Sequence, residues 1–191
     1  FLIDFQQGKD WSWAVLRPEA VCGFAVGNPM NLIMCFGTYA AISKELGMPL
    51  KYPGDLRGFE AINQVTDSGL LARMTLWSAT SPNAANEIFN ITNGDGFRYV
   101  NVWPDWAAAF GMEVGMAQRI ISAEVMPDKG PVWDRIVEKH GLMKLTYEQT
   151  AGWPYFDFNM DTAWDVLMSD AKRIDKGFTE MVDTEKMFLD L

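Results

Sequence analysis

The sequence has few of the residues from which metal sites and nucleophilic catalytic sites are built. Among its 191 residues are one histidine, His140, and two cysteines, Cys22 and Cys35. A zinc site or a Ser-His-Asp or Cys-His arrangement needs several such groups close together, and these three are widely spread. We therefore predict no metal ligands and no nucleophilic triad. Two cysteines are also too few for a disulfide framework, which favours a reduced, cytoplasmic protein.

Excess positive charge and long apolar runs are also missing. The chain has 16 Lys and Arg against 25 Asp and Glu, a formal net charge of −9 at pH 7. Such a surface repels phosphate, so we expect neither nucleic acid nor an anionic membrane as a partner. No apolar stretch approaches the roughly 18 residues of a transmembrane helix. The N-terminal residues FLIDFQQGKD lack the basic region of a signal peptide.

What the chain does contain is an ordinary globular balance with many large rings. Hydrophobic residues make up 49% and charged residues 21%, and there are eight Trp and twelve Phe. Aromatic side chains bury about 150–250 Å² each, so these imply a large core, an apolar cavity or an interface left open by truncation. No repeat or linker is evident, and we expect one domain over residues 1–191. A start in mid-helix and an end at MFLDL suggest a fragment cut at both ends.

The stretch 11–32 combines the patterns of a strand, a glycine-spaced loop and the start of a helix. Trp11–Leu16 alternates like a strand, and Pro18 is expected to end it because proline cannot donate to a ladder. Asn28 and Pro29 predict the N-cap and first residue of a helix over 29–46. Ligands of α/β enzymes commonly bind where a strand gives way to a helix. We therefore expect a binding site in this stretch.

The rest of the chain is predicted to be mostly helical, with a few short strands, which is an α/β pattern. Helices are predicted at 1–7, 68–79 (capped by Asp67), 99–110, 120–126, 132–140, 163–174 and 184–191, strands at 48–52 and 87–91, and either state at 153–160. His140 lies near the end of one such helix, where a cation complements the helix dipole. We assign it a structural role.

Dinucleotide-binding fingerprints and P-loops are absent. Gly94-Asp95-Gly96 and Gly23…Gly27 lack the preceding strand, the following helix and the acidic residue about 20 positions later that the fingerprint requires. The pyrophosphate of any bound nucleotide would therefore be held by residues outside this sequence. The carboxylates are scattered, and none is assigned to catalysis. Met30 and Met34 lie near the suspected loop, where they form either core filler or a soft apolar wall.

Four segments, in order, carry a family resemblance. They are RPEAVCGFAVGNPMNL, TYAAISKELGMPLKYPG, FNITNGDGFRY and KGPVWDRIVEKHGL. They resemble the progesterone 5β-reductase and iridoid synthase-like group of extended short-chain dehydrogenase/reductases, strongly over residues 11–142 and more weakly in the aromatic tail. The resemblance implies that this chain is the C-terminal, substrate-binding portion of a Rossmann-type enzyme, including the last strand of its sheet. The dinucleotide-binding half, with the catalytic Tyr and Lys, would precede Phe1, so no catalytic residue is expected in this chain.

The resemblance also implies contacts with the cofactor. In the family, the apolar residue after the Arg-Pro strand end meets the nicotinamide through its backbone, and here that residue is Val21. The turn before the helix also touches the cofactor, and here it comprises Asn28, Pro29 and Met30. Backbone groups at these positions can fix the carboxamide and so select the ring face that delivers hydride. NADPH is the expected cofactor of the intact protein, and binding of no cofactor by this fragment alone is left open.

Substrate contacts follow from the same resemblance. An aromatic residue of the tail lines the family's substrate pocket, and the matching position is Tyr155, with Trp153 and Phe156 beside it. Met34 is added as part of the apolar wall. A tyrosine where an apolar ring is expected, and Phe59 where a tryptophan is often found, leave the substrate open.

The implied reaction of the intact protein is hydride transfer from NADPH to an enone or carbonyl compound, with this fragment itself inactive. Two alternatives stay open: a non-catalytic binding module on a reductase-like scaffold, and an NAD-dependent epimerase or dehydratase of the same superfamily. The expected partner is a small-molecule substrate. A half-enzyme exposes surface that its other half covers, so we also expect a homo-oligomer.

Overall fold

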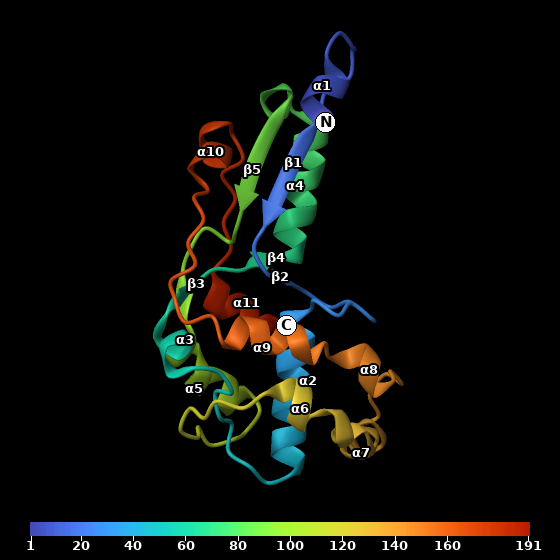
Figure 1. Cartoon of the computed structure of the whole chain (residues 1–191), viewed down its shortest axis with the longest axis vertical. Coiled ribbons are helices and arrows are strands. Elements are labelled where there is room, and N and C mark those ends of the chain that lie inside the picture. The colour runs from blue at the N-terminus through green and yellow to red at the C-terminus, as the bar shows by residue number, and fades with distance from the viewer.

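Two distant segments with alternating apolar residues form a parallel strand pair. In the computed structural model, which describes residues 1–191, β1 (Ala14–Pro18) pairs with β5 (Glu87–Ile91) in a register that runs from Ala14↔Glu87 to Pro18↔Ile91. Helix α4 (Ser68–Thr80) packs on β1. A small core forms between this helix and the strand pair, with Leu70 and Met74 from α4 and Phe89 and Ile91 from β5. These elements make up the upper end of the molecule in Figure 1.

Helices dominate the remainder of the chain. They are α1 (Leu2–Gln6), α2 (Leu32–Glu45), α3 (Leu56–Glu60), α5 (Tyr99–Ala109), α6 (Ser122–Val125), α7 (Gly130–His140), α8 (Tyr147–Thr150), α9 (Trp153–Met160), α10 (Ala171–Asp175) and α11 (Thr184–Asp190), with 3₁₀ turns η1 (Pro82–Ala84) and η2 (Pro127–Lys129). Strand β2 (Val21–Cys22) pairs in parallel with β4 (Thr66–Asp67), and β3 (Ile62–Asn63) pairs antiparallel with β6 (Phe97–Arg98). This confirms the predicted α/β class, mostly helical with short strands. None of the helices combines the length and apolar character needed to cross a bilayer.

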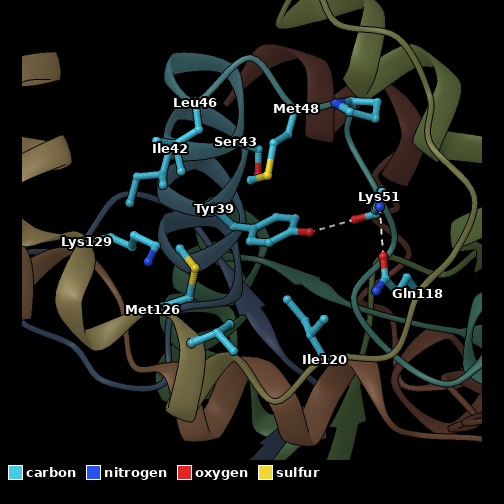
Figure 2. A pocket seen from close by; sticks show the side chains of 12 residues that line it. Tyr39, Ile42, Ser43, Leu46, Met48, Lys51, Gln118, Ile120, Met126 and Lys129 are labelled. Atoms are coloured by element: carbon cyan, nitrogen blue, oxygen red, sulfur yellow. Dashed lines mark hydrogen bonds between the residues drawn. The ribbon is translucent and has the colours of Figure 1, made fainter.

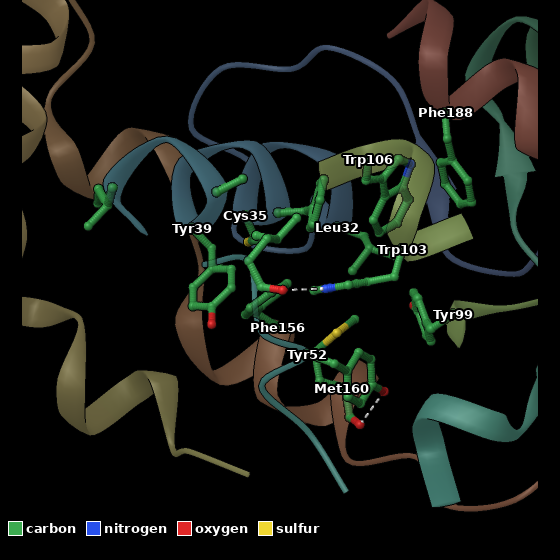
Figure 3. Close-up of a cluster of buried hydrophobic side chains, with 14 of the residues drawn as sticks. Leu32, Cys35, Tyr39, Tyr52, Tyr99, Trp103, Trp106, Phe156, Met160 and Phe188 are labelled. Atoms are coloured by element: carbon green, nitrogen blue, oxygen red, sulfur yellow. Dashed lines mark hydrogen bonds between the residues drawn. The ribbon is translucent and has the colours of Figure 1, made fainter. Parts of the chain in front are cut away.

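The abundant aromatic residues pack into a core around α2. Figure 3 shows rings from α5 and α9 gathered against this helix. The Phe36 and Trp106 ring centroids are 3.9 Å apart. Two of the buried rings are hydrogen-bonded through their polar ends: Trp103 Nε1 donates to the Leu50 carbonyl at 3.1 Å, and the Tyr52 hydroxyl donates to the Met160 carbonyl at 2.6 Å. Of the explanations for the ring content, a large core is therefore observed.

A buried arginine fastens the C-terminal segment to the end of β5. Arg173 of α10 is fully buried and donates to Asp170 Oδ1 at 2.8 Å. The same guanidinium donates to the carbonyls of Thr92, Phe178 and Glu180. Asp170 in turn accepts from the Thr92 amide at 3.0 Å. A charge at this depth is tolerated because its partner and its hydrogen bonds replace water.

The neighbouring residue, Asn93, ties the same point to two more elements. Its Oδ1 accepts from the Asp67 amide at 2.6 Å, and its Nδ2 donates to Thr184 Oγ1 at 2.9 Å. Asp67 ends β4 and caps α4 as predicted, with Oδ1 accepting from the Leu70 amide at 2.7 Å. Strand β4, helix α4 and helix α11 are therefore held together at residues 92–93.

Some predicted boundaries are wrong. Strand β1 begins at Ala14 instead of Trp11 and keeps Pro18 as its last residue, because the next ladder bond is donated by the Glu19 amide to Ile91. Instead of a strand, 48–52 contains only an isolated bridge from Leu50 to Val114. Prolines at 49 and 53 deprive this segment of donors on both sides.

The predicted helix over 163–174 is also wrong in its first half. The Val166 amide donates to the Ile62 carbonyl at 2.8 Å, and the Met168 amide donates to Gln64 Oε1 at 2.6 Å. These bonds keep the segment extended beside β3, and helical structure is confined to α10. The predicted helix over 120–126 shortens to α6, whereas 153–160 is helical.

We predict that Arg173→Met destabilises the protein by about 3–5 kcal/mol, because Asp170 is left buried without its partner. The matched control is Arg73→Met, which removes an exposed pair with Glu180 (N–O distance 2.6 Å) and should cost less than about 1 kcal/mol. Urea denaturation of both variants measures these changes. Equal midpoints for the two variants would contradict the assigned role of Arg173.

Candidate functional site

The segment that follows β1 is shaped by a close approach to α4. Val21 lies half-buried in β2 opposite Thr66, and Cys22 beside it is fully buried. A Cβ at Gly23 would lie 2.2 Å from Ser68 Oγ at the start of α4. Only glycine allows the chain to pass there. Beyond it, the loop from Phe24 to Met30 is largely exposed.

The helix after this loop begins three residues later than predicted. Its N-cap is Asn31 rather than Asn28, with Oδ1 accepting from the Met34 amide at 3.1 Å. Asn31 Nδ2 also donates to the Gly23 carbonyl at 2.8 Å, so one buried side chain caps α2 and closes the loop. Asn28 Oδ1 instead accepts from the Met30 amide at 3.0 Å, which places Pro29 in a tight turn. The signal for Asn31 was its place directly before the apolar run LIMCF.

The loop packs against the start of α9. A Cβ at Gly152 would lie 2.0 Å from the Pro29 carbonyl oxygen. The Gly152 amide donates to Cys35 Sγ at 3.2 Å, and the Gly27 amide donates to the Gln149 carbonyl at 3.3 Å. The structure thus brings the predicted cofactor turn next to the helix that begins at Trp153, although their sequence positions are more than a hundred residues apart. Gly152 and Gln149 were not recognised from the sequence.

The predicted substrate residues differ in their surroundings. Trp153 is 7% exposed and Phe156 is fully buried, and the Phe156 ring lies 5.6 Å from that of Tyr39 in the core. Tyr155 and Met34 are half-buried. Burial raises the pKa of the Tyr155 hydroxyl, while a hydrogen bond with Asn159 opposes this shift. Tyr155 is therefore the aromatic residue of the three that is both partly open and polar, and it is neutral over the ordinary pH range.

A cavity of about 130 Å³ lies beside Asn159, whose Nδ2 donates to the Tyr155 carbonyl at 2.8 Å. Tyr155 itself is not part of its lining, nor are the other predicted site residues. The lining includes Glu19, Ala20, Val65, Tyr99, Phe158 and Asn159. Glu19, together with Cys22 and Cys35 outside the cavity, also raises the pKa of Tyr155 beyond the effect of burial. The cavity combines apolar walls with the carboxylate of Glu19 and the amides of Asn63, Gln64 and Asn159, which suits a small molecule that carries polar groups as well as an apolar body. Its residues come from separate segments, so no local sequence pattern could have assembled them.

Comparison with known proteins identifies the family. The description "PRISE-like Rossmann-fold domain" matches residues 1–189. The chain belongs to this family. The match confirms the resemblance carried by the four sequence segments. Its description as a Rossmann-fold domain agrees with the α/β class of the structure.

Relatives of this PRISE-like chain include a plant protein and a fungal protein. It is 33% identical over 190 residues to (S)-8-oxocitronellyl enol synthase ISY1 of Nepeta cataria, covering 97% of this chain and 48% of that protein. It is 33% identical over 207 residues to the short chain dehydrogenase gsfE of Penicillium aethiopicum, covering 99% and 54%. The chain therefore spans about half the length of the curated relatives it matches.

A solved structure shares the fold. RMD from Pseudomonas aeruginosa, complexed with NADPH, superposes with a TM-score of 0.58 at 14% identity, covering 99% of this chain and 49% of that one. At this identity the similarity shows the fold alone. The roles predicted for Val21, Asn28, Pro29, Met30, Met34, Trp153, Tyr155 and Phe156 stay predictions.

We predict that Gly152→Ala destabilises the protein by about 1–3 kcal/mol, because the added methyl group overlaps the Pro29 carbonyl. Gly37→Ala in α2 is the control: a Cβ there meets nothing within 4 Å, and alanine should stabilise the helix by about 0.5–1 kcal/mol. Denaturant unfolding gives both values. Limited proteolysis should also cut the loop at 24–30 faster in Gly152→Ala. A neutral Gly152→Ala would refute the close contact.

A second prediction concerns the two thiols beside the loop. Burial raises the pKa of Cys22 to about 12 and that of Cys35 to about 11, from an ordinary value of 9.0. The unfolded chain therefore loses these protons first as pH rises, and the free energy of unfolding should fall by about 1 kcal/mol per thiol between pH 9 and pH 10. Below pH 8 the thiols should have no effect. Denaturation at each pH measures the slope, and Cys35→Ala should remove about 1 kcal/mol of the fall between pH 9 and pH 10.

Proposed function

We propose that this chain forms the substrate-side part of an NAD(P)H-dependent reductase that acts on an enone or carbonyl compound, with NADPH as cofactor. The observation that carries the proposal is the contact of Pro29 with Gly152. It sets the loop expected at the nicotinamide beside the helix that bears Tyr155. A family relative named an enol synthase, and a structure of the same fold complexed with NADPH, support this proposal.

The loop fits the nicotinamide end of the cofactor. Phe24, Val26 and Met30 expose 65%, 48% and 63% of their surface beside half-buried Val21. These apolar side chains suit a flat ring, whereas the loop has no Lys or Arg to hold a pyrophosphate. Val21 and the turn at 28–30 would orient the ring, and NADPH would supply a hydride. The pyrophosphate would be held by a nucleotide-binding half, in line with the missing glycine fingerprint.

The sheet supports a two-part enzyme in a separate way. Parallel sheets normally have several strands and both faces covered. Here α4 covers the face that carries Phe89, whereas half-buried Val15 and exposed Ile88 lie opposite each other on the other face. By our proposal β1 and β5 belong to a larger Rossmann sheet. The same exposed apolar groups underlie our expectation of self-association.

This chain's own contribution would be to bind and orient the substrate. Tyr155 neighbours Asn159, which lines the cavity, and its hydroxyl, whose pKa burial raises, would hold a polar substrate group without giving up its proton at neutral pH. The donor that stabilises the developing oxyanion would come from the nucleotide-binding half. The 191-residue chain alone is therefore expected to be inactive.

The test compares this chain with a longer protein in which it is joined to a nucleotide-binding half. The longer protein should oxidise NADPH in the presence of some members of a panel of enones and aldehydes, and the chain alone should not. In the longer protein, Tyr155→Phe should raise KM by about tenfold, as expected for a lost hydrogen bond to substrate. Substrate binding without turnover would instead favour a binding module. A product of unchanged oxidation state, without net consumption of NADPH, would favour an epimerase or dehydratase.

A further inference from the structure

A second cavity lies at the C-terminal end of α2, and the proposed function does not use it. Its volume is about 220 Å³. Its apolar lining includes Ile42, Leu46, Met48, Ile120, Val125 and Met126. Figure 2 shows Ile42, Met48, Ile120 and Met126 around the ring of Tyr39. A cavity of about 150 Å³ is enough for benzene. This space therefore has room for an apolar body larger than a single ring.

The charge around this cavity differs from that of the chain as a whole. Acidic residues outnumber basic ones by 25 to 16 in the sequence, yet the lining contains two lysines and no carboxylate. Figure 2 places Lys51 and Lys129 on opposite sides of Tyr39. Lys129 already forms an ion pair, because its Nζ lies 2.6 Å from Asp128 Oδ1. Lys51 Nζ instead donates to the neutral amide oxygen of Gln118 at 2.7 Å and forms no ion pair.

Lys51 is also held in place. A Cβ at Gly115 would lie 2.6 Å from Lys51 Cγ, so the chain packs tightly over the stem of this lysine. The Lys51 carbonyl accepts from the Tyr39 hydroxyl at 3.0 Å, which fixes the backbone beside the cavity. A half-buried cation whose stem is ordered loses little further freedom when an anion binds.

We propose that this cavity binds a small amphiphilic carboxylate. Its apolar body would lie against Ile42 and Met126, and its carboxylate would accept from Lys51 Nζ in place of Gln118. Charge-assisted hydrogen bonds of this kind are stronger than the amide contact they replace. The proposal depends on the cavity and its charges alone, and it holds whether or not the chain takes part in a reductase.

The test uses octanoate and octanol as probes, because they share an apolar chain and differ in charge. Octanoate should bind more tightly than octanol in isothermal titration calorimetry. Lys51→Met should weaken octanoate binding by about tenfold or more and leave octanol unchanged. Lys129→Met is the matched control within the same cavity, and it should change octanoate binding by less than about twofold, since that lysine is already paired.

Two further measurements locate the bound probe. Val125→Trp, which fills the cavity from a side chain that is 43% exposed, should abolish binding of both probes, and Leu46→Trp serves the same purpose if Val125→Trp does not fold. The methyl NMR signals of Met48 and Met126 should shift with octanoate, whereas that of Met181 should not. The proposal is overturned if octanoate does not bind, if the two lysine variants weaken it equally, or if a folded cavity-filling variant still binds.

Discussion

The end of β5 is the point on which the remaining arrangement depends, and a buried guanidinium secures it. Arg173 donates to three carbonyls and a carboxylate, and all but the Glu180 carbonyl are in buried hydrogen bonds, where polar groups must be satisfied within the protein. Beside it, Asn93 fixes the Asp67 amide, and β4 in turn pairs with β2. The position of Val21, at the base of the candidate site, therefore rests on polar contacts in a quite different part of the sequence.

This dependence explains what could be predicted from the sequence. The cap at Asp67 and the strand at 87–91 have local causes, and both are found as predicted. The true cap of α2 was missed because Asn28-Pro29 is also a local cap pattern, and what distinguishes Asn31 is its second bond, which reaches the Gly23 carbonyl across the loop. The extended segment around Val166 was missed for the same reason, since its partner Ile62 is about a hundred residues away.

The candidate site shows the same division. Family resemblance selected the loop at 28–30 and the helix at 153–156, and the structure adds that Gly152 brings the two into contact. The cavity beside Asn159 has no counterpart in any sequence pattern, because its walls come together only in the folded chain. Both cavities lie along α2: its first residue, Leu32, lines the one beside Asn159, and its last turns line the one near Lys51. A single helix thus supplies walls to two spaces of opposite charge character.

The parallel pairing of β1 with β5 has a consequence for the folding of the protein during its synthesis. Everything from α2 to η1 lies between the two strands in sequence, so their pairing closes a long loop and carries the entropic cost of doing so. On the ribosome, β1 emerges first and then waits for β5. At roughly 5–20 residues per second this interval lasts several seconds. During that time the apolar side chains of Val15 and Leu16 lack the partner strand beside which they lie in the folded chain.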